Sequence, residues 1–534
     1  MLRRVAWEGE RVKIFQKLRY VILEHPLYYF TIEILSLHSE HKTGFNLSIG
    51  YYVFMTANDF FRFLQHIRIE DSTRNSVIWI YMARSVSIPQ KFCYFIFVPR
   101  NYHLSIVEKA VILGREIFIK MSTNPGDATV SQIASDNLRG LVDLIASELQ
   151  IKDYEITFKQ QEFTGDNYCG EISRVQIIPR KGNIGQKVLN LFVKTAPTDS
   201  SSRNALPIQK FYVAEVFAYT EILPAFYRLH DEFNISKENR FISATFYKGI
   251  DKEFKEIVIL EDLSEDGFVM TDKKSVFDYD HAALVLKNMA RIHAPSFAMK
   301  EKHPEQFSKL TDHLPNKINF GEHLMTMIEN NASTVVTHIG CPEIRAKLDS
   351  FVGKIREICT GLLNSALSEP YNVVCHGDSW SNNMLFKYDK AQGADEQKVV
   401  FIDWQIVRYS SPLADICYML CLSTDKHLLN THLRKLLDLY YETLSLSLKE
   451  MDCDVEKSFP KEVFMEHFRR FMLLGLSMVL GFIPMDFCES GNIKPIADYD
   501  YKGGKNSAKD FIISDLGVTK IREIVDFFVK NDFL

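Results

Sequence analysis

Apolar side chains recur at helical spacing in several stretches of this chain. Over residues 129–150 they form one apolar stripe, and Thr129 or Ser131 is placed to cap the first turn. The same periodicity predicts further helices over residues 207–222, 282–293, 316–327, 427–448 and 463–480. Phe471, Leu474, Met478 and Phe482, in and just after the last of these stretches, have the spacing of one helix face, which indicates a core stripe more often than a pocket lining.

Other stretches alternate apolar and polar residues, or are continuously apolar, as strands do. They predict strands over residues 154–161, 173–178, 189–194 and 257–263. Residues 384–388 and 398–402 flank a polar turn, so we expect them to form the two arms of a hairpin.

The first 120 residues differ from the rest of the 534-residue chain. They hold 16 Lys and Arg against 10 Asp and Glu, whereas the whole chain has a net charge of −5. Such an asymmetry indicates segments of separate origin. We consider two hypotheses for residues 1–120: a small extra domain, or an upstream stretch added by an imprecise gene model to a natural protein that begins at Met121.

Composition narrows the function classes. The acidic net charge does not favour a nucleic-acid binder. Nine scattered cysteines without a CxxC pair indicate neither a zinc site nor a disulfide framework, and they predict a reducing, cytoplasmic location. The longest apolar run, residues 471–485, is shorter than a membrane span and fits a buried helix, so we expect no span. The sequence carries no signal of an oligomeric state.

The part before residue 263 carries candidate nucleotide-binding groups. A turn containing Gly165 and Asn167 lies between two predicted strands and could offer backbone N–H groups to phosphates, or be a plain hairpin turn. Lys194 ends a predicted strand, and Glu215 stands on an otherwise apolar helix face. A buried carboxylate requires a partner, so we expect a Lys194–Glu215 ion pair of the kind that orients ATP phosphates in kinases.

The strand over residues 257–263 ends in an acidic pair. In a two-lobed kinase, a strand of this form leads into the hinge between the lobes. The Glu261 C=O and the Leu263 N–H would then bind the adenine, although any core strand could show the same pattern.

The stretch of residues 373–405 is the most informative. Asp378 precedes Asn383 by five residues, and Asp403 follows the second arm of the predicted hairpin. Antiparallel pairing brings Asn383 and Asp403 to the same end of that hairpin, beside the loop that carries Asp378. Amide and carboxylate oxygens suit Mg²⁺, and a further carboxylate can accept a hydroxyl proton. The arrangement therefore predicts phosphoryl transfer.

The motif His376-Gly377-Asp378, with Asn383 and Ile402-Asp403-Trp404, resembles the signature of aminoglycoside and choline phosphotransferases. The fuller string His-Gly-Asp-x-Trp-x-x-Asn-x-x-Phe, with Leu260-Glu261-Asp262-Leu263 upstream, is more similar to the ecdysteroid-kinase-like family, also called CHK-kinase-like. The resemblance covers about residues 125–500 and leaves out residues 1–120.

This resemblance implies an α+β, two-lobed protein-kinase-like fold. A small β-rich N-lobe would span residues 121–262, and a large helical C-lobe would span residues 263–534, with the catalytic loop at 375–386. It also implies ATP-dependent phosphorylation of a hydroxyl on a small molecule such as an ecdysteroid or a xenobiotic. If the roles of the family's motif residues apply to the matching positions here, Asp378 is the catalytic base. Asn383 and Asp403 would then hold Mg²⁺, and Lys194 with Glu215 would orient ATP.

Departures from protein kinases disfavour a protein substrate. Gly377 stands where their catalytic loop carries Arg, and about eleven residues separate Asp403 from Asp415, too few for a peptide-docking segment. Asp415 either braces the catalytic loop or simply opens a helix, and His293 is expected to be a satisfied core histidine. The alternatives are a choline- or aminoglycoside-type phosphotransferase and a nucleotide- or sterol-binding module without catalysis.

Overall fold

The computed structural model describes residues 12–14, 29–35, 37–39, 48–54, 68–71, 77–81, 94–97, 129–160, 170–180, 187–272, 275–314, 321–389, 396–487 and 513–534. The chain divides into two units, Met1–Val130 and Ser131–Leu534. The sequence places this boundary near residue 120, and the structure places it after Val130.

The described part of the first unit consists of antiparallel strands. Two pairs and one three-stranded sheet form: β1 (Val12–Ile14) with β3 (Leu37–Ser39), β2 (Tyr29–Leu35) with β4 (Ser48–Phe54), and β5 (Arg68–Asp71) with β6 (Val77–Tyr81) and β7 (Tyr94–Phe97). Both hypotheses for residues 1–120 stay predictions.

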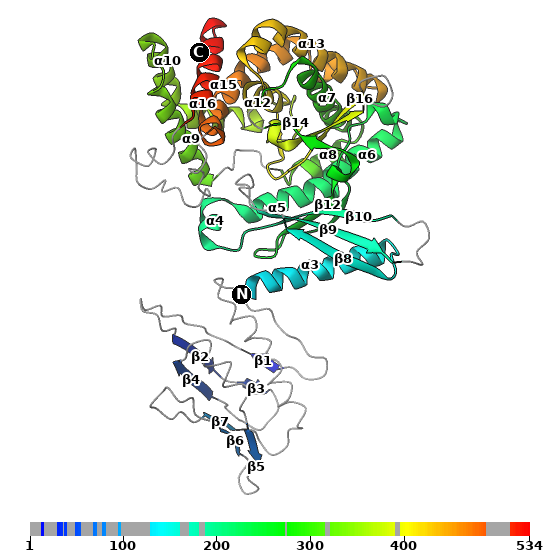
Figure 1. Cartoon of the computed structure of the whole chain (residues 1–534), viewed down its shortest axis with the longest axis vertical. Coiled ribbons are helices and arrows are strands. Elements are labelled where there is room, and N and C mark those ends of the chain that lie inside the picture. The colour runs from blue at the N-terminus through cyan, green and yellow to red at the C-terminus, as the bar shows by residue number, and fades with distance from the viewer. Residues whose placement is uncertain are drawn as a thin grey trace. The chain divides into compact units, whose positions relative to one another are not determined.

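The second unit contains an antiparallel five-stranded sheet in the order β11-β12-β10-β9-β8 (Figure 1). Its strands are β8 (Tyr154–Gln160), β9 (Glu171–Pro179), β10 (Leu189–Thr195), β11 (Phe246–Ile250) and β12 (Ile257–Glu261). The sequence predicts four of the five. It misses β11, where a register shift between Phe246 and Lys248 interrupts the alternation of side chains.

Each face of this sheet is covered by a helix. Leu191 and Val193 of β10 pack with Ile257 and Ile259 of β12 in a core that includes α3 (Thr129–Glu148). The alternate residues Val258 and Leu260 belong to the core that includes α5 (Ile208–Phe217). Because side chains alternate along a strand, Lys194 lies on the α5 face, where Glu215 is.

Two local predictions around α5 are wrong. Residues 197–203 are polar and lie outside the helices predicted from periodicity, but most of α4 (Ser200–Ala205) falls there. Asp199 caps this helix by accepting a hydrogen bond from Ser202 N–H. The helix predicted to end at residue 222 continues through a π-helical turn into α6 (Leu223–Glu232). Pro224 lies in the first turn of α6, where a missing N–H is tolerated, so it does not end the helix.

The rest of the second unit is mainly helical. Its long helices α7 (Tyr279–Lys302) and α13 (Lys426–Glu450) pack together, as do α12 (Leu413–Ser423) and α15 (Lys461–Asp486) (Figure 1). The remaining helices are α8 (Pro304–Thr311), α9 (Gly321–Val336), α10 (Pro342–Val352), α11 (Ile355–Leu362), α14 (Val455–Ser458) and α16 (Asp515–Lys530). A β-rich lobe thus precedes a larger helical lobe, which confirms the two-lobed α+β prediction.

Short strands between helices α11 and α12 of the helical lobe carry the chemical motif. β15 (Met384–Asp389) pairs with β16 (Glu396–Phe401), as predicted, and β13 (Val269–Met270) adds to β15. β14 (Val373–Cys375) pairs with β17 (Arg408–Ser410).

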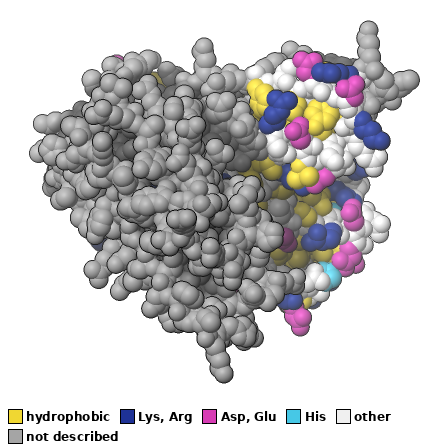
Figure 2. Space-filling view, turned by 90° about the horizontal axis from the view of Figure 1, so that it is seen from below, with side chains coloured by type: hydrophobic (Ala, Val, Ile, Leu, Met, Phe, Trp, Pro, Cys, Tyr) yellow, Lys and Arg dark blue, Asp and Glu magenta, His cyan; other side chains and the backbone are white. Residues whose placement is uncertain are grey.

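Helix α15 is long and apolar enough to cross a membrane, and 78% of its apolar window is buried within the fold. Phe471, Leu474 and Met478 are fully buried, as core residues are, whereas Phe482 is only partly buried. On the described part of the face in Figure 2, basic, acidic and hydrophobic side chains are interspersed.

Candidate active site

Three charged side chains from three elements meet beside the sheet. Lys194 Nζ on β10 lies 2.9 Å from Glu215 Oε2 on α5, which confirms the predicted ion pair. The same nitrogen lies 2.5 Å from Asp403 Oδ1, in the segment after β16. One lysine thus links both lobes through two carboxylates, a contact that sequence reasoning missed because Asp403 lies 209 residues away.

The environment of Glu215 depends on this lysine. Burial raises the pKa of Glu215 to about 7, the Asp403 charge acts in the same direction, and Lys194 opposes both. Glu215 is almost fully buried, so without Lys194 it would be an unpaired buried carboxyl group. The pair therefore fixes the lysine ammonium beside Asp403.

The catalytic loop holds Asp378 through both carboxylate oxygens. Tyr418 O–H donates to Oδ1 at 2.7 Å, and Asn383 Nδ2 donates to Oδ2 at 2.8 Å. Burial, the largest effect, raises the pKa of Asp378, and the Asp403 charge adds to it. A raised pKa makes a carboxylate a better proton acceptor.

The hairpin brings the two predicted metal ligands to one end. Ile402 N–H donates to the Asn383 carbonyl at 3.0 Å. Asp403 is the next residue after Ile402, so its backbone lies close to Asn383. Asp403 has φ of 65°, in the left-handed region that Asn and Asp tolerate better than other non-glycine residues. This backbone conformation directs its side chain toward Lys194.

His376 joins the loop to the same strand. Its Nε2 donates to the Ile402 carbonyl at 2.9 Å, and Asp378 N–H donates to Nδ1 at 3.3 Å. Burial lowers the pKa of His376, so the ring remains neutral and can accept at Nδ1. The first residue of the motif thus positions the loop.

The donor set fits Mg²⁺. Asn383 Nδ2 is engaged with Asp378, and no described residue donates to Asn383 Oδ1, so that oxygen can serve as a ligand. The Asp403 side chain is partly exposed and supplies carboxylate oxygen. Hard cations prefer such ligands.

Gly377 has a conformation and a surrounding that only glycine fits. Its φ is 88°, and a Cβ there would lie 2.1 Å from the Ile406 carbonyl oxygen. The buried Arg408 side chain occupies the adjacent space, with Nε 2.9 Å from that Cβ position. The backbone after Asp403 therefore passes directly against the catalytic loop.

We expect Gly377→Ala to destabilise the protein by about 2–5 kcal/mol, from left-handed strain together with overpacking. Thermal unfolding measures the change. Gly361→Ala is the matched control, because a Cβ at Gly361 meets nothing within 4 Å. Equal melting temperatures of the two variants would contradict the tight contact.

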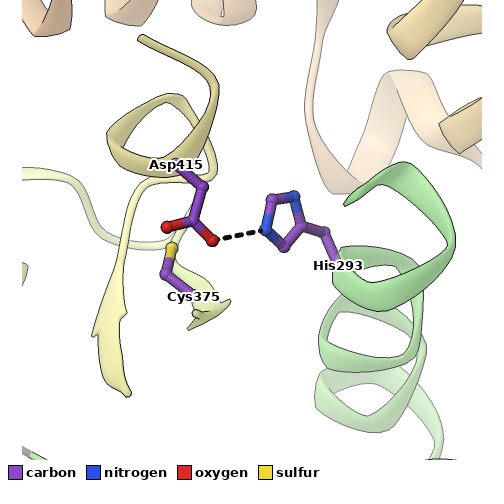
Figure 3. A group of neighbouring side chains, drawn as sticks. All are labelled: His293, Cys375 and Asp415. Carbon is purple, nitrogen blue, oxygen red and sulfur yellow. Dashed lines mark hydrogen bonds and ion pairs between the residues drawn. The ribbon is translucent and has the colours of Figure 1, made fainter. Parts of the chain in front are cut away.

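Asp415 braces the catalytic loop, one of the two roles considered for it. Its carboxylate accepts from His376 N–H at 2.7 Å and from Gly377 N–H at 2.9 Å. His293 Nε2 donates to the same carboxylate at 3.2 Å (Figure 3). His293 Nδ1 forms a hydrogen bond with the Tyr440 hydroxyl at 2.9 Å. His293 is thus a satisfied core histidine, as predicted.

Cys375 lies beside this pair, and the ligand atoms of Cys375, His293 and Asp415 are within 4.8 Å of one another (Figure 3). Cys375 Sγ donates to the Ser410 and Ser411 carbonyls, and burial raises the pKa of its thiol well above the usual value. Each ligand atom has a hydrogen-bond partner, so we assign a structural role to the cluster.

The predicted adenine and phosphate contacts stay predictions. Glu261 ends β12, and its side chain accepts from the Thr245 hydroxyl. Leu263 is buried in the turn that follows. Gly165 and Asn167 lie outside the described residues.

An aromatic pair joins the catalytic loop to helix α15. Trp380, two residues after Asp378, is partly exposed and packs against Phe482 of α15 with ring centroids 6.1 Å apart. Its Nε1 is buried and has no hydrogen-bond partner among the described residues. Four residues were considered as pocket lining: Phe471, Leu474, Met478 and Phe482. Among the described ring contacts, only that of Phe482 joins one of them to the catalytic loop.

A separate cavity of about 1060 Å³ lies along α5, α8 and residues 405–408. Phe211, Phe217 and Leu310 belong to its lining, whereas Lys194, Asp378 and Asp403 do not.

Residues 164–453, more than half of the chain, match the ecdysteroid kinase-like family. The chain belongs to this family. The match includes Lys194, Glu215 and the whole catalytic loop, and it confirms the resemblance seen in the sequence.

Membership in the ecdysteroid kinase-like family makes the chain a small-molecule kinase, a phosphotransferase with an alcohol group as acceptor. No curated protein matches the chain. Among solved structures, the microcompartment-associated aminopropanol kinase is similar, at 10% identity over 74% of this chain and 99% of that chain, with a TM-score of 0.30.

Proposed function

We propose that the protein transfers the γ-phosphoryl group of ATP to a hydroxyl of an apolar alcohol, such as an ecdysteroid-like steroid or a xenobiotic. The observation that carries this proposal is the group formed by Lys194, Glu215 and Asp403, with Asp378 and Asn383 beside it. Phosphoryl transfer requires positioning, positive charge and a proton acceptor, and these side chains can supply all three.

In the proposed reaction, the acceptor oxygen forms a bond to the γ-phosphorus, and its proton passes to the Asp378 carboxylate. The bond between the γ-phosphorus and the bridging oxygen breaks, and ADP leaves with that electron pair. Lys194 neutralises phosphate charge from a place fixed by Glu215. Mg²⁺, when bound, supplies further charge neutralisation, and Asn383 with Asp403 would hold it.

Trp380 and Phe482 support an apolar acceptor. An aromatic pair beside the proton acceptor favours a flat, mainly apolar body.

The test is phosphorylation by purified protein with ATP and Mg²⁺, across ecdysteroids, plant phenols, choline and aminoglycosides. We expect turnover with the apolar ring alcohols. Turnover confined to choline or aminoglycosides would favour the alternative phosphotransferase, and ATP binding without transfer to any alcohol would favour a binding module.

We expect Trp380→Ala to raise the KM of an apolar acceptor roughly fivefold and to leave the KM of ATP unchanged, because the lost ring contact contributes on the order of 1 kcal/mol. Phe254→Ala is the control, since Phe254 is an exposed aromatic residue outside the catalytic loop. An unchanged acceptor KM would show that Trp380 does not contact the acceptor.

We also propose a cytoplasmic location. The support is that the nine cysteines are scattered and odd in number, which is typical of a protein without a disulfide framework. Cell fractionation tests it.

A further inference from the structure

Helix α12 contacts the catalytic loop at both of its ends. Near the start of the helix, Asp415 accepts the backbone N–H groups of His376 and Gly377. At the end, Ser423 Oγ accepts from Ser381 N–H at 2.9 Å. These contacts hold the loop backbone on either side of Asp378.

Tyr418 lies one turn after Asp415, so both side chains leave the helix on the same face. Its hydroxyl donates to Asp378 Oδ1 at 2.7 Å, and the tyrosine is 4% exposed. Asn383 Nδ2 holds the other carboxylate oxygen. Two donors from separate elements thus fix the rotation of the Asp378 side chain.

We propose that Tyr418 is a positioning residue that sets the orientation of the Asp378 carboxylate for transfer to the alcohol. This inference rests on the proposed function of Asp378 as proton acceptor. Tyr418 contacts the proposed base directly, so its effect on the reaction would pass through Asp378.

The chemistry of a buried phenol suits this task. Burial and the Asp378 charge raise the pKa of Tyr418 well above its usual value, so its hydroxyl keeps its proton and remains a donor. The hydrogen bond from Tyr418 lowers the pKa of Asp378, but a neutral donor does so less than a cation in the same place would, so it orients the carboxylate at a smaller loss of basicity. A proton acceptor misplaced by a fraction of an ångström loses much of its effect.

The test is Tyr418→Phe, which removes only the hydroxyl. Tyr441→Phe is the matched control, because Tyr441 is a buried tyrosine whose hydroxyl donates to the Glu456 carboxylate at 2.8 Å, outside the catalytic loop. We expect Tyr418→Phe to lower kcat about 10- to 100-fold with little change in the KM of ATP or of the acceptor. Tyr441→Phe should keep the wild-type kcat.

A double-mutant cycle separates positioning from a structural effect. In the Asp378→Ala background, Tyr418→Phe should cause no further loss, since the group that it orients is absent. An equal fractional loss in both backgrounds, a raised KM of ATP, or an unchanged kcat would overturn the proposal.

A crystal structure of Tyr418→Phe gives a readout that does not depend on turnover. We expect the Asp378 carboxylate to rotate or to take two orientations, and a single unchanged orientation would overturn the inference. Wild-type protein that phosphorylates no alcohol in the panel would instead refute the proposed function, so the two failures are distinguishable.

Discussion

Asp378→Asn is expected to reduce phosphorylation of the acceptor by about 10²–10⁴-fold, the usual contribution of a general base. The amide is nearly the same size as the carboxylate but cannot accept the hydroxyl proton. Lys194, Glu215 and Asp403 are untouched, so ATP binding should persist. Steady-state kinetics and nucleotide titration calorimetry measure the two effects separately.

Asp378→Ala should give a similar loss of turnover, since it also removes the proton acceptor. Asp438→Asn is the control for loss of a carboxylate, because Asp438 pairs with Lys461 and Arg434 on the helical lobe. Near-normal turnover of Asp378→Ala would show that another group takes the proton.

Asp403→Asn is expected to raise the Mg²⁺ concentration needed for half-maximal activity at least tenfold. The substitution removes one negative charge from the oxygen donors and breaks the ion pair with Lys194. Asn tolerates the left-handed backbone found at this position, so the loss should come from charge and not from strain. Magnesium titrations of initial rate provide the measurement.

The same titration of Asp438→Asn should reproduce the wild-type curve. Were Asp403→Asn also to match the wild type, Asp403 would not be a metal ligand.

The sequence could predict the parts of the site that follow from local periodicity. Alternation along β10 places Lys194 on one face, and helical spacing places Glu215 among apolar residues, so their pairing follows from burial alone. The β15–β16 hairpin likewise brings Asn383 and Asp403 together through simple antiparallel register.

The sequence could not predict the contacts between distant elements. Tyr418 stands in the almost continuously apolar helix α12, where one tyrosine looks like any core residue. Lys194 contacts Asp403 only because the folded chain places β10 of the first lobe beside the segment after β16 of the second lobe. The continuation of this helix beyond Pro224 to Glu232 is not predicted, because the π-helical turn before α6 interrupts the periodic signal.

The path of the chain after Asp403 has a consequence for control of the enzyme. Strand β17 begins five residues after Asp403 and pairs with β14, and Ile406 lies against Gly377. These contacts hold the segment after Asp403 against the catalytic loop and against β14. We therefore expect that phosphorylation would not move it, as it moves an activation segment. We expect a constitutively competent catalyst, whose output in the cell follows protein synthesis, protein turnover and the supply of alcohol.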